Sequence, residues 1–326
     1  MEEKKTGRVL VTGSIAFDYL MQFSGQFSDY LIPEKLETIS VSFLVHSLKK
    51  QWGGCAGNIA YSLALLGERP LLVATAGKDF SEYRAFLEGA GVDTSGVRVF
   101  QEEFTASFFA NTDKKGNQIC SFYTGAMRFA KSHPIDPFLE DQNLVIISPN
   151  DPEAMVLHVQ TCQEKNVPYI YDPGQQIVCL EPNELIRGIQ GAKVLILNEY
   201  EFELLKKKTQ MSDVQLVNSV SVLVVTLGEN GSIFWTKEGK IQIPIARPLR
   251  VVDPTGVGDA FRAGLIKGML LGLDWEITGR IGSVAAAYVI ETEGPQAHMY
   301  TLSEFYHRYE ENFGFCEVLQ KRLLAS

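Results

Sequence analysis

The stretch Asp253-Pro254-Thr255-Gly256-Val257-Gly258-Asp259 is followed at once by a helical pattern over residues 260–270. Gly256 and Gly258 allow the backbone to turn with its N–H groups outward, and the next helix adds the positive end of its dipole, so we expect an anion there. A carboxylate such as Asp259 would repel a resting phosphate, but it suits a base that takes a proton from a hydroxyl attacking a phosphoryl group. The stretch therefore predicts a phosphoryl-transfer site. A glycine turn with Asp259 as an ordinary helix cap is the alternative.

Length and charge limit the classes of protein that fit. The chain has 326 residues, 45% of them hydrophobic, and a net charge of −9. It can bury a large core, either as two domains or as one large α/β domain with a small appendage. The negative charge argues against nucleic acid and against an anionic membrane as partners.

Cysteine and histidine usage indicates neither disulfides nor zinc. The five cysteines are scattered without a Cys-x-x-Cys pair, and the five histidines show no metal-ligand spacing. The first residues lead straight into a strand pattern, and no apolar run reaches the roughly 18 residues of a membrane span. We expect a cytoplasmic protein.

Short aliphatic runs alternate with longer helical patterns, which is typical of βαβ units and a mostly parallel sheet. The clearest strands are residues 8–12, 71–76, 144–148, 169–172, 194–198 and 222–226. Several end in a polar residue. Ligands bind beyond the carboxyl ends of the strands in open parallel sheets, so we expect these ends to line one crevice.

Two stretches depart from this rhythm. Residues 39–45 alternate with period two, and residues 105–110 and 118–123 flank a polar turn as a hairpin would. We expect antiparallel ribbons that form a separate small sheet.

Four segments resemble one family in the right order. They are Gly13-Ser14-Ile15-Ala16-Phe17-Asp18, Gly53-Gly54-Cys55-Ala56-Gly57-Asn58, Asn198-Glu199-Tyr200-Glu201 and the stretch from Asp253 to Phe261, which together span nearly the whole chain. The last resembles the C-terminal signature of the ribokinase-like (PfkB) carbohydrate and nucleoside kinases, in the form found in bacterial adenosine kinases. The resemblance implies a three-layer α/β/α fold with a mostly parallel central sheet. It also implies one kinase domain over residues 1–326, with a β-sheet lid from about 18–47 and about 98–124.

The resemblance assigns the sugar side of the acceptor site. Asp18 would accept hydrogen bonds from two ribose hydroxyls, with Ser14 as a further contact. Gly54 would let the backbone lie close to the ligand, and Asn58 offers both a donor and an acceptor. Turn and cap roles are the alternative for each of these residues.

The same resemblance assigns the ATP side. Asn198 and Glu201 would organise Mg²⁺ and its waters, although Glu201 also suits an acidic first helical turn. Thr226, Gly228 and Gly231 would approach the nucleotide. The N–H groups at Gly256, Val257 and Gly258 would stabilise the transferring phosphoryl group beside Asp259, so that Gly256 and Gly258 also bind ATP. The implied cofactors are ATP and Mg²⁺.

The lid and one loop bear on the acceptor. Phe108 and Phe122 could stack on a flat base from facing strands, with packing of the lid itself as an equally weighted alternative. Gln175 and Gln176 could pair with an adenine edge. These two residues and Ser42 match the bacterial adenosine kinases.

We therefore expect an ATP-dependent adenosine kinase that gives AMP, a reaction of purine salvage. A kinase of another nucleoside or of a sugar is the alternative, and a non-catalytic nucleoside-binding protein is a third hypothesis. The exposed strands of the lid favour a homodimer through the lid.

Overall fold

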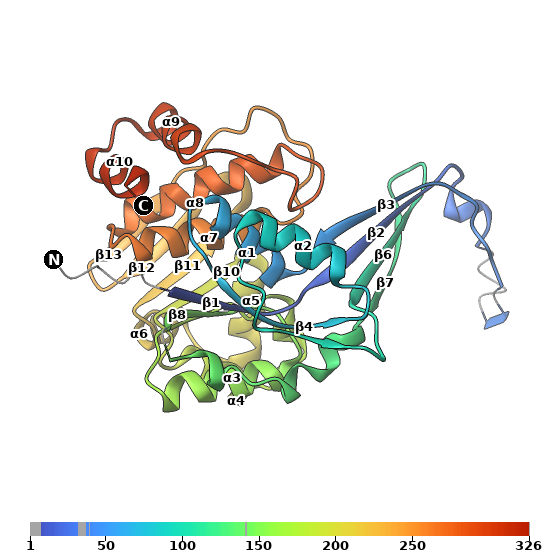
Figure 1. The fold of residues 1–326 in the computed structure, drawn as a ribbon, viewed down its shortest axis with the longest axis horizontal. Helices are drawn as coiled ribbons and strands as arrows, with labels where there is room; N and C mark the ends of the chain where they lie inside the picture. The colour runs from blue at the N-terminus through green and yellow to red at the C-terminus, as the bar shows by residue number, and fades with distance from the viewer. Residues whose placement is uncertain (1–7, 32–36, 39, 141, 326) are drawn as a thin grey trace.

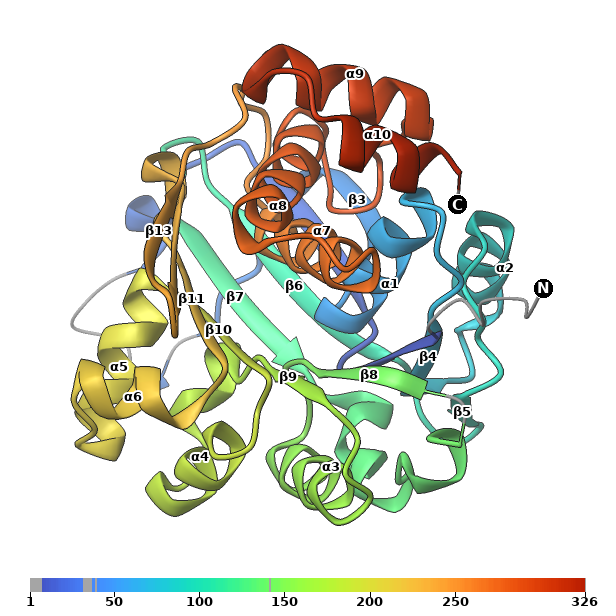
Figure 2. The same ribbon diagram turned by 90° about the vertical axis from the view of Figure 1, so that its left-hand side faces the viewer.

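Residues 8–31, 37–38, 40–140 and 142–325 are described by the computed structural model. A nine-stranded sheet lies between two layers of helices (Figures 1 and 2). The strand order is β13-β12-β11-β10-β9-β8-β1-β4-β5, and all pairs from β5 to β11 are parallel, whereas β12 and β13 are antiparallel additions. This arrangement confirms the expected three-layer α/β/α fold.

The strands of the large sheet are buried because they are covered on both faces. Their bounds are β1 (Arg8–Thr12), β4 (Leu71–Gly77), β5 (Val97–Phe100), β8 (Gln142–Ile147), β9 (Tyr169–Tyr171), β10 (Val194–Asn198), β11 (Val222–Thr226), β12 (Ser232–Thr236) and β13 (Gly239–Ile243). The six strands predicted for this sheet each appear, with ends that differ by at most two residues.

Alternate residues of each strand enter different cores. In β1, Val9 and Val11 join one buried cluster and Leu10 joins the other. The first core packs against α1 (Cys55–Leu65), α2 (Ser81–Ala90), α7 (Val257–Leu270), α8 (Trp275–Ile290), α9 (Leu302–Phe313) and α10 (Glu317–Leu324). The second packs against α3 (Pro152–Glu164), α4 (Pro182–Ile189), α5 (Glu199–Thr209) and α6 (Asp213–Ser219) on the opposite face (Figure 2).

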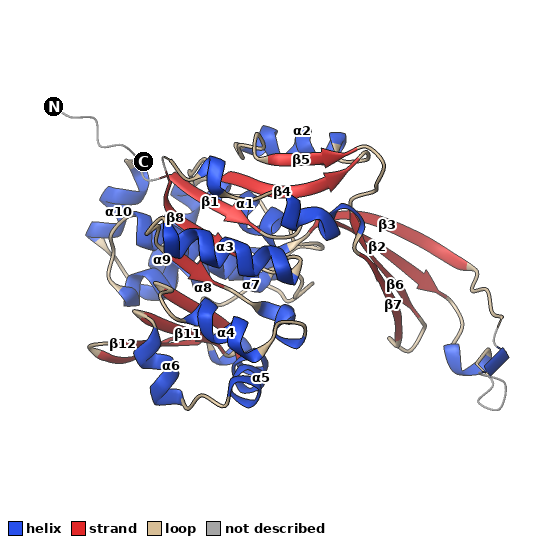
Figure 3. Cartoon of the chain, turned by 90° about the horizontal axis from the view of Figure 1, so that it is seen from below, coloured by secondary structure: helices blue, strands red, loops and turns tan. Residues whose placement is uncertain are grey.

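A separate small sheet projects from the core (Figure 3). Its strands, in the order β3-β2-β6-β7, are β2 (Ala16–Phe23), β3 (Val45–Gly53), β6 (Ala106–Thr112) and β7 (Gln118–Tyr123). The hairpin of β6 and β7 confirms one predicted ribbon. However, β2 and β6 pair in parallel, so the small sheet is mixed rather than antiparallel. We call this sheet the lid; its strands extend to Gly53, past the expected limit near 47, and resume at Ala106 rather than near 98.

The strand predicted over residues 39–45 is wrong. Ile39 lies outside the described residues, residues 40–44 form no strand, and β3 begins only at Val45. Within this segment Phe43 packs its ring against Phe23 and Phe27, with centroids 5.1 and 4.9 Å away, whereas Val41 is exposed. The packing of this one ring, rather than strand pairing, attaches the segment to the lid.

In the part of the chain that the structure describes, no helix is long and apolar enough to cross a membrane.

Candidate active site

The polar ends of the central strands meet in one cleft, as the sequence predicts. A cavity of about 710 Å³ is lined by Asp172, Asn198 and Thr226, which follow or end β9, β10 and β11. The first turn of α7 closes the same cavity. Parallel strands place their carboxyl ends at one edge of the sheet, and this is where ligands bind in open α/β folds.

The N-terminus of α7 is open to an anion. Gly256 is left-handed, with φ of 78°, and a Cβ there would lie 2.4 Å from the Pro295 side chain. Gly256 provides no capping side chain, and the N–H of Val257 already donates to the Pro254 carbonyl at 3.3 Å. Within the described residues, the N–H groups of Gly258 and Asp259 have no backbone acceptor. The donors for an anion are therefore Gly258 and Asp259 more than Val257.

Asp259 lies in this first turn and is partly buried. Its withdrawal from water raises its pKa from 3.8 to about 6. The cation of Arg262 and a hydrogen bond from Asn58 act in the opposite direction and favour the carboxylate. A carboxylate with a pKa near 6 suits a general base at neutral pH.

A buried ion pair, which sequence reasoning missed, supports this turn. The Nε and Nη2 atoms of Arg262 donate to the two carboxylate oxygens of Asp172 at 2.5 and 2.6 Å, and its Nη1 donates to the Gly258 carbonyl at 3.0 Å. Arg262 thereby fixes the backbone of the anion site and holds a positive charge near Asp259. The spacing of Arg262 after Gly258 was visible in the sequence, but its partner lies 90 residues away.

Asn198 and Glu201 make a reciprocal capping box at the start of α5. The Asn198 Oδ1 accepts from the Glu201 N–H, and the Glu201 carboxylate accepts from the Asn198 N–H, both at 2.8 Å. Both residues also line the cleft, where burial and then the charge of Asp172 raise the pKa of Glu201. The described residues contain no group of three metal-ligating side chains. One carboxylate with one amide fits Mg²⁺, which retains most of its waters.

Asp18 lies on β2 of the lid rather than in the turn after β1. Burial, and then the charge of Asp253, raise its pKa to about 6. Asp18 pairs in register with Phe108 on β6, and Phe108 pairs with Phe122 on β7. Residues directly opposite one another in a sheet point to the same side. Asp18, Phe108 and Phe122 therefore share one face of the lid, with Phe122 52% exposed.

The remaining residues predicted on the sugar side have structural partners here. The Ser14 hydroxyl accepts from the Cys55 N–H at 3.1 Å. Gly54 is left-handed, and a Cβ there would lie 2.6 Å from the Ser14 carbonyl oxygen. Asn58 donates from its Nδ2 to the Asp259 Oδ2 at 2.8 Å, so it contacts the candidate base directly.

The residues predicted near the base are not all brought together. Gln175 is exposed and lines the cleft, whereas the N–H of Gln176 closes a turn onto Pro173. Ser42 is exposed beside Phe43, whose ring packs on Phe23. Phe23 stands five residues along β2 from Asp18, a distance of about 17 Å in a strand. Ser42 therefore lies at the far end of the lid, away from Asp259.

The predicted nucleotide side surrounds the turn after β11. Thr226, Gly228 and Gly231 all line the cleft. No atom lies within 4 Å of a Cβ built on Gly228, so its backbone is open to a ligand. A Cβ on Gly231 would lie 2.0 Å from the Ile243 carbonyl oxygen, which explains that glycine by packing alone.

The other wall of the cleft is a loop over residues 244–252 that sequence reasoning did not identify. Ile245, Ala246, Pro248 and Val251 line the cavity. Because Val251 is 72% exposed despite its apolar side chain, this wall offers apolar surface to a flat ring.

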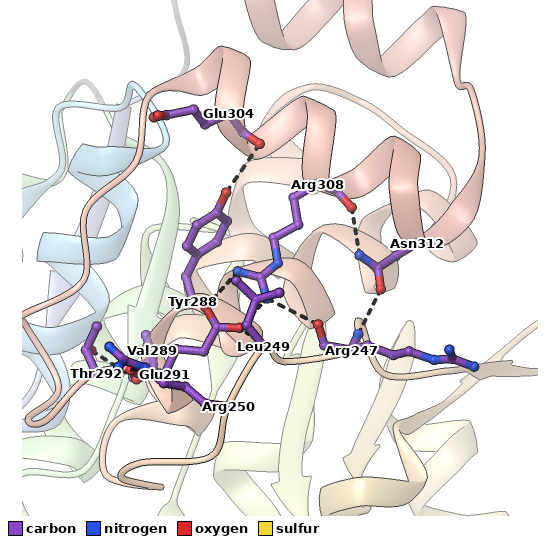
Figure 4. Close-up of polar contacts among 10 residues, drawn as sticks. All are labelled: Arg247, Leu249, Arg250, Tyr288, Val289, Glu291, Thr292, Glu304, Arg308 and Asn312. Atoms are coloured by element: carbon purple, nitrogen blue, oxygen red, sulfur yellow. Dashed lines mark hydrogen bonds and ion pairs between the residues drawn. The ribbon is translucent and has the colours of Figure 1, made fainter.

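Residues of helix α9 and the residue that follows α8 hold this loop by hydrogen bonds to its backbone (Figure 4). Arg308 and Glu291 form a buried ion pair, in which the Arg308 Nη1 donates at 2.9 Å. Glu291 also accepts from the Leu249 N–H, and the Asn312 Oδ1 accepts from the Arg247 N–H at 2.8 Å. Helix α9 therefore sets the position of the loop that borders the cleft.

Comparisons with known proteins agree with this geometry. Residues 24–302 match the model of the pfkB family carbohydrate kinases. The nucleoside kinase of Methanocaldococcus jannaschii is 30% identical over 310 residues, which cover 94% of this chain and 98% of that protein. The nucleoside kinase of Burkholderia thailandensis in complex with inosine has a TM-score of 0.84 and 37% identity, covering 94% of this chain and 98% of that one. Its complex described as ADP-inosine has a TM-score of 0.83 at the same identity, covering 94% and 96% of the two chains.

The chain belongs to the pfkB family of carbohydrate kinases, within the ribokinase-like fold. It is a phosphotransferase with an alcohol acceptor, and the two relatives compared above are described as nucleoside kinases.

Proposed function

We propose that this protein is an ATP-dependent nucleoside kinase that transfers the γ-phosphoryl group to the 5′-hydroxyl of adenosine and gives AMP. One observation carries the proposal. Asp259 lies at the open N-terminus of α7, on the cleft, and its carboxylate is held by Asn58. A base with a pKa near 6 beside an anion site supports phosphoryl transfer to a hydroxyl.

In the proposed reaction, Asp259 accepts the proton of the 5′-hydroxyl. The hydroxyl oxygen forms its bond to the γ-phosphorus as the bond from that phosphorus to the bridging oxygen of ADP breaks. The N–H groups of Gly258 and Asp259, with those of Gly256 and Val257 nearby, stabilise the charge on the transferring group. Arg262 keeps this turn rigid through the Gly258 carbonyl.

Asn198 and Glu201 would hold Mg²⁺ through its waters. The metal, when bound, neutralises charge on the phosphates. Thr226 and the open backbone of Gly228 would line the path of the phosphates, and the apolar loop over residues 244–252 would contact the adenine of ATP.

The lid face supports a nucleoside rather than a bare sugar as acceptor. Asp18 would bind the ribose hydroxyls, and Phe108 and Phe122 on the same face would stack on the base. A glutamine such as Gln175 can donate to and accept from a base edge. Rotation of its amide exchanges these roles, so Gln175 fits inosine as well as adenosine.

Inosine is therefore the second candidate acceptor, because the Burkholderia thailandensis relative is described in complex with it. A sugar acceptor remains the competing hypothesis within the family. The third hypothesis, a non-catalytic nucleoside-binding protein, is not carried further, since such a protein has no use for a base such as Asp259.

One assay tests the proposal. ADP release is measured with adenosine, inosine, guanosine, ribose and fructose as acceptors, for wild type and for Asp259→Asn. We expect adenosine to have the highest kcat/KM and the variant to lose about 10² to 10⁴ in turnover, the usual contribution of a general base. Equal use of ribose or fructose would overturn the nucleoside acceptor, and a variant with more than a tenth of wild-type turnover would overturn the role of Asp259.

We also propose a homodimer through the lid. Every residue of the edge strand β7 is exposed, and an unpaired edge offers its N–H and C=O groups to a second copy. Light scattering should give twice the chain mass, and Ile119→Lys on β7 should lower it. A monomeric wild type would contradict the dimer.

A further inference from the structure

A line of buried hydrogen bonds connects the base of the lid to Asp259. The Tyr83 hydroxyl donates to the Gly53 carbonyl at 2.9 Å, at the end of lid strand β3. The Gln296 Nε2 donates both to the Tyr83 oxygen and to the Asn58 Oδ1, the latter at 2.8 Å. The Asn58 Nδ2 then donates to the Asp259 Oδ2 at 2.8 Å.

The donor and acceptor roles along this line of hydrogen bonds are determined at the end that contacts the lid. The Gly53 carbonyl can only accept, so the Tyr83 proton points to it and the Tyr83 oxygen must accept from Gln296. Gln296 therefore donates from its NH₂ group, and Asn58 must accept with its side-chain carbonyl oxygen. That choice turns the NH₂ group of Asn58 toward Asp259. The opposite amide orientation would direct a carbonyl oxygen at the carboxylate and repel it.

Burial makes this arrangement costly to disturb. Tyr83 is 0% exposed, Asn58 5% and Gln296 6%. The Gln296 Oε1 is buried and has no partner among the described residues. Its amide is therefore oriented by its two N–H contacts, at the cost of an unsatisfied acceptor, and a residue chosen only for packing would avoid that cost.

We propose that Gln296 is a positioning residue for the kinase reaction, which orients the Asn58 amide toward Asp259 and connects that carboxylate to the lid at Gly53. This inference rests on the proposed role of Asp259 as the base. A movement of the lid at Gly53 would displace Tyr83 and Gln296 in turn and weaken or strengthen the hydrogen bond from Asn58 to Asp259.

Other charged and titratable groups also act on Asp259. Arg262 lowers its pKa, whereas Asp172 and Glu201 raise it. Tyr83 and Cys55 are the further titratable groups whose interaction with Asp259 appears in their own pKa shifts, and burial keeps both neutral near pH 7. Replacing Gln296 with a side chain of similar length without donors leaves Arg262, Asp172, Glu201 and Cys55 unaltered. It removes a hydrogen bond that lowers the pKa of Tyr83, so Tyr83 stays neutral near pH 7. A change in the pH dependence of Gln296→Met would therefore report on the Asn58 contact.

The experiment compares Gln296→Met with Gln163→Met. Gln163 is a matched control, because its Nε2 also donates to a tyrosine, at 3.1 Å from the Tyr169 hydroxyl, but its other acceptors are the Arg187 and Gln190 carbonyls rather than Asn58. We expect Gln296→Met to lower kcat about tenfold and to move the acidic limb of kcat to higher pH by about one unit, the worth of a hydrogen bond to a charged group. The KM for ATP should stay unchanged, and Gln163→Met should behave as wild type in all three measurements.

Tyr83→Phe is the second variant, and it decides the question if Gln296→Met does not fold. It removes the hydroxyl that fixes the orientation of Gln296. We therefore expect a lower kcat and a shift of the acidic limb to higher pH, both smaller than in Gln296→Met. A wild-type pH profile in every folded variant of Gln296 and Tyr83 would overturn the inference. If Asp259→Asn nevertheless loses its turnover, the proposed function stands and only the role of Gln296 fails. If Asp259→Asn keeps its turnover, the proposed role of Asp259 as the base fails, and the inference about Gln296 fails with it.

Discussion

Asp259 balances two opposing effects within one helical turn. Its partial burial disfavours the charged carboxylate, whereas the helix N-terminus, Arg262 and Asn58 favour it. Burial is the larger effect, so the pKa lies near 6 rather than 3.8. The residue is therefore ionised at neutral pH and still basic enough to accept a proton.

The first prediction concerns the pH dependence of turnover. A base with a raised pKa works only above that pKa, so kcat should be constant near pH 7.5 and fall about tenfold per unit below pH 6. At saturating substrate concentrations, the pH dependence of kcat should follow the ionisation of a single group. A kcat that stays flat to pH 5 would show that the Asp259 carboxylate does not need to be ionised.

A second carboxylate makes kcat/KM different from kcat. Asp18 also has a pKa near 6, and we expect it to bind the nucleoside in its charged form. The free enzyme must then lose two protons before it is active. A plot of log(kcat/KM) for adenosine against pH should therefore reach a limiting slope of two on its acidic side. Asp18→Ala should restore a slope of one and lower kcat/KM about 10- to 150-fold, the worth of 1.5–3 kcal/mol for charged hydrogen bonds. An unchanged KM for adenosine in this variant would remove Asp18 from the ribose site.

Helix α9 does not line the cleft, but it contacts a loop that does. Its Arg308 and Asn312 hold the loop over residues 244–252, which carries apolar contacts to the cavity (Figure 4). Because the Glu291 carboxylate is buried with Arg308, removal of Arg308 would leave a charge unpaired and unfold the region. Asn312 offers a milder change to the same clamp.

Asn312→Ala should raise the KM for ATP about fivefold, since one net hydrogen bond to the loop is worth about 1 kcal/mol. The KM for adenosine and kcat at saturating ATP should not change, because the loop borders only the nucleotide side. Glu311→Ala is the control, as Glu311 lies on the same helix and pairs with His307 at the surface. A variant that raises both KM values equally would indicate general destabilisation instead.

Across the whole molecule, the proposed acceptor site is divided between the large α/β core and the lid. Asp259 belongs to the large α/β core, whereas Asp18, Phe108 and Phe122 belong to the lid that projects from it (Figure 3). Half of the Phe122 side chain is exposed, so its stacking on a base depends on the lid meeting the ligand. Closure of such a lid would also exclude water from the reaction.

Phe122→Ala should therefore reduce the preference for adenosine over ribose by about 5- to 150-fold in kcat/KM, the worth of 1–3 kcal/mol for stacking on a base. Part of the loss should appear in kcat, because closure is weakened as well. Ile119→Ala is the control on the same strand, since residues an odd number apart point to opposite faces. Equal losses in the two variants would place the effect in lid stability rather than in base stacking.

The sequence by itself determined the parts that depend on local pattern. The alternation of short apolar runs with longer helical patterns predicted six core strands within two residues, because strands buried on both faces are near-continuous aliphatic runs. Gly256, just before α7, takes the left-handed turn that the sequence predicted there, whereas Gly258 lies within the helix; this turn places Asp259 beside the proposed anion site. Residues 39–45 misled the same reasoning, because residues 40–44 pair with no strand and Phe43 instead packs against the rings of Phe23 and Phe27.

Only the tertiary structure decided which distant side chains act together. Asp172 meets Arg262 across 90 residues, and Gln296 meets Asn58 across 238. These contacts arise from the order in which the strands are laid into the sheet, and no short-range pattern encodes that order. The sequence therefore pointed to Asp259 as the proposed base and to the proposed anion site beside it, whereas the groups that contact Asp259 and shift its pKa became visible only when the chain was folded.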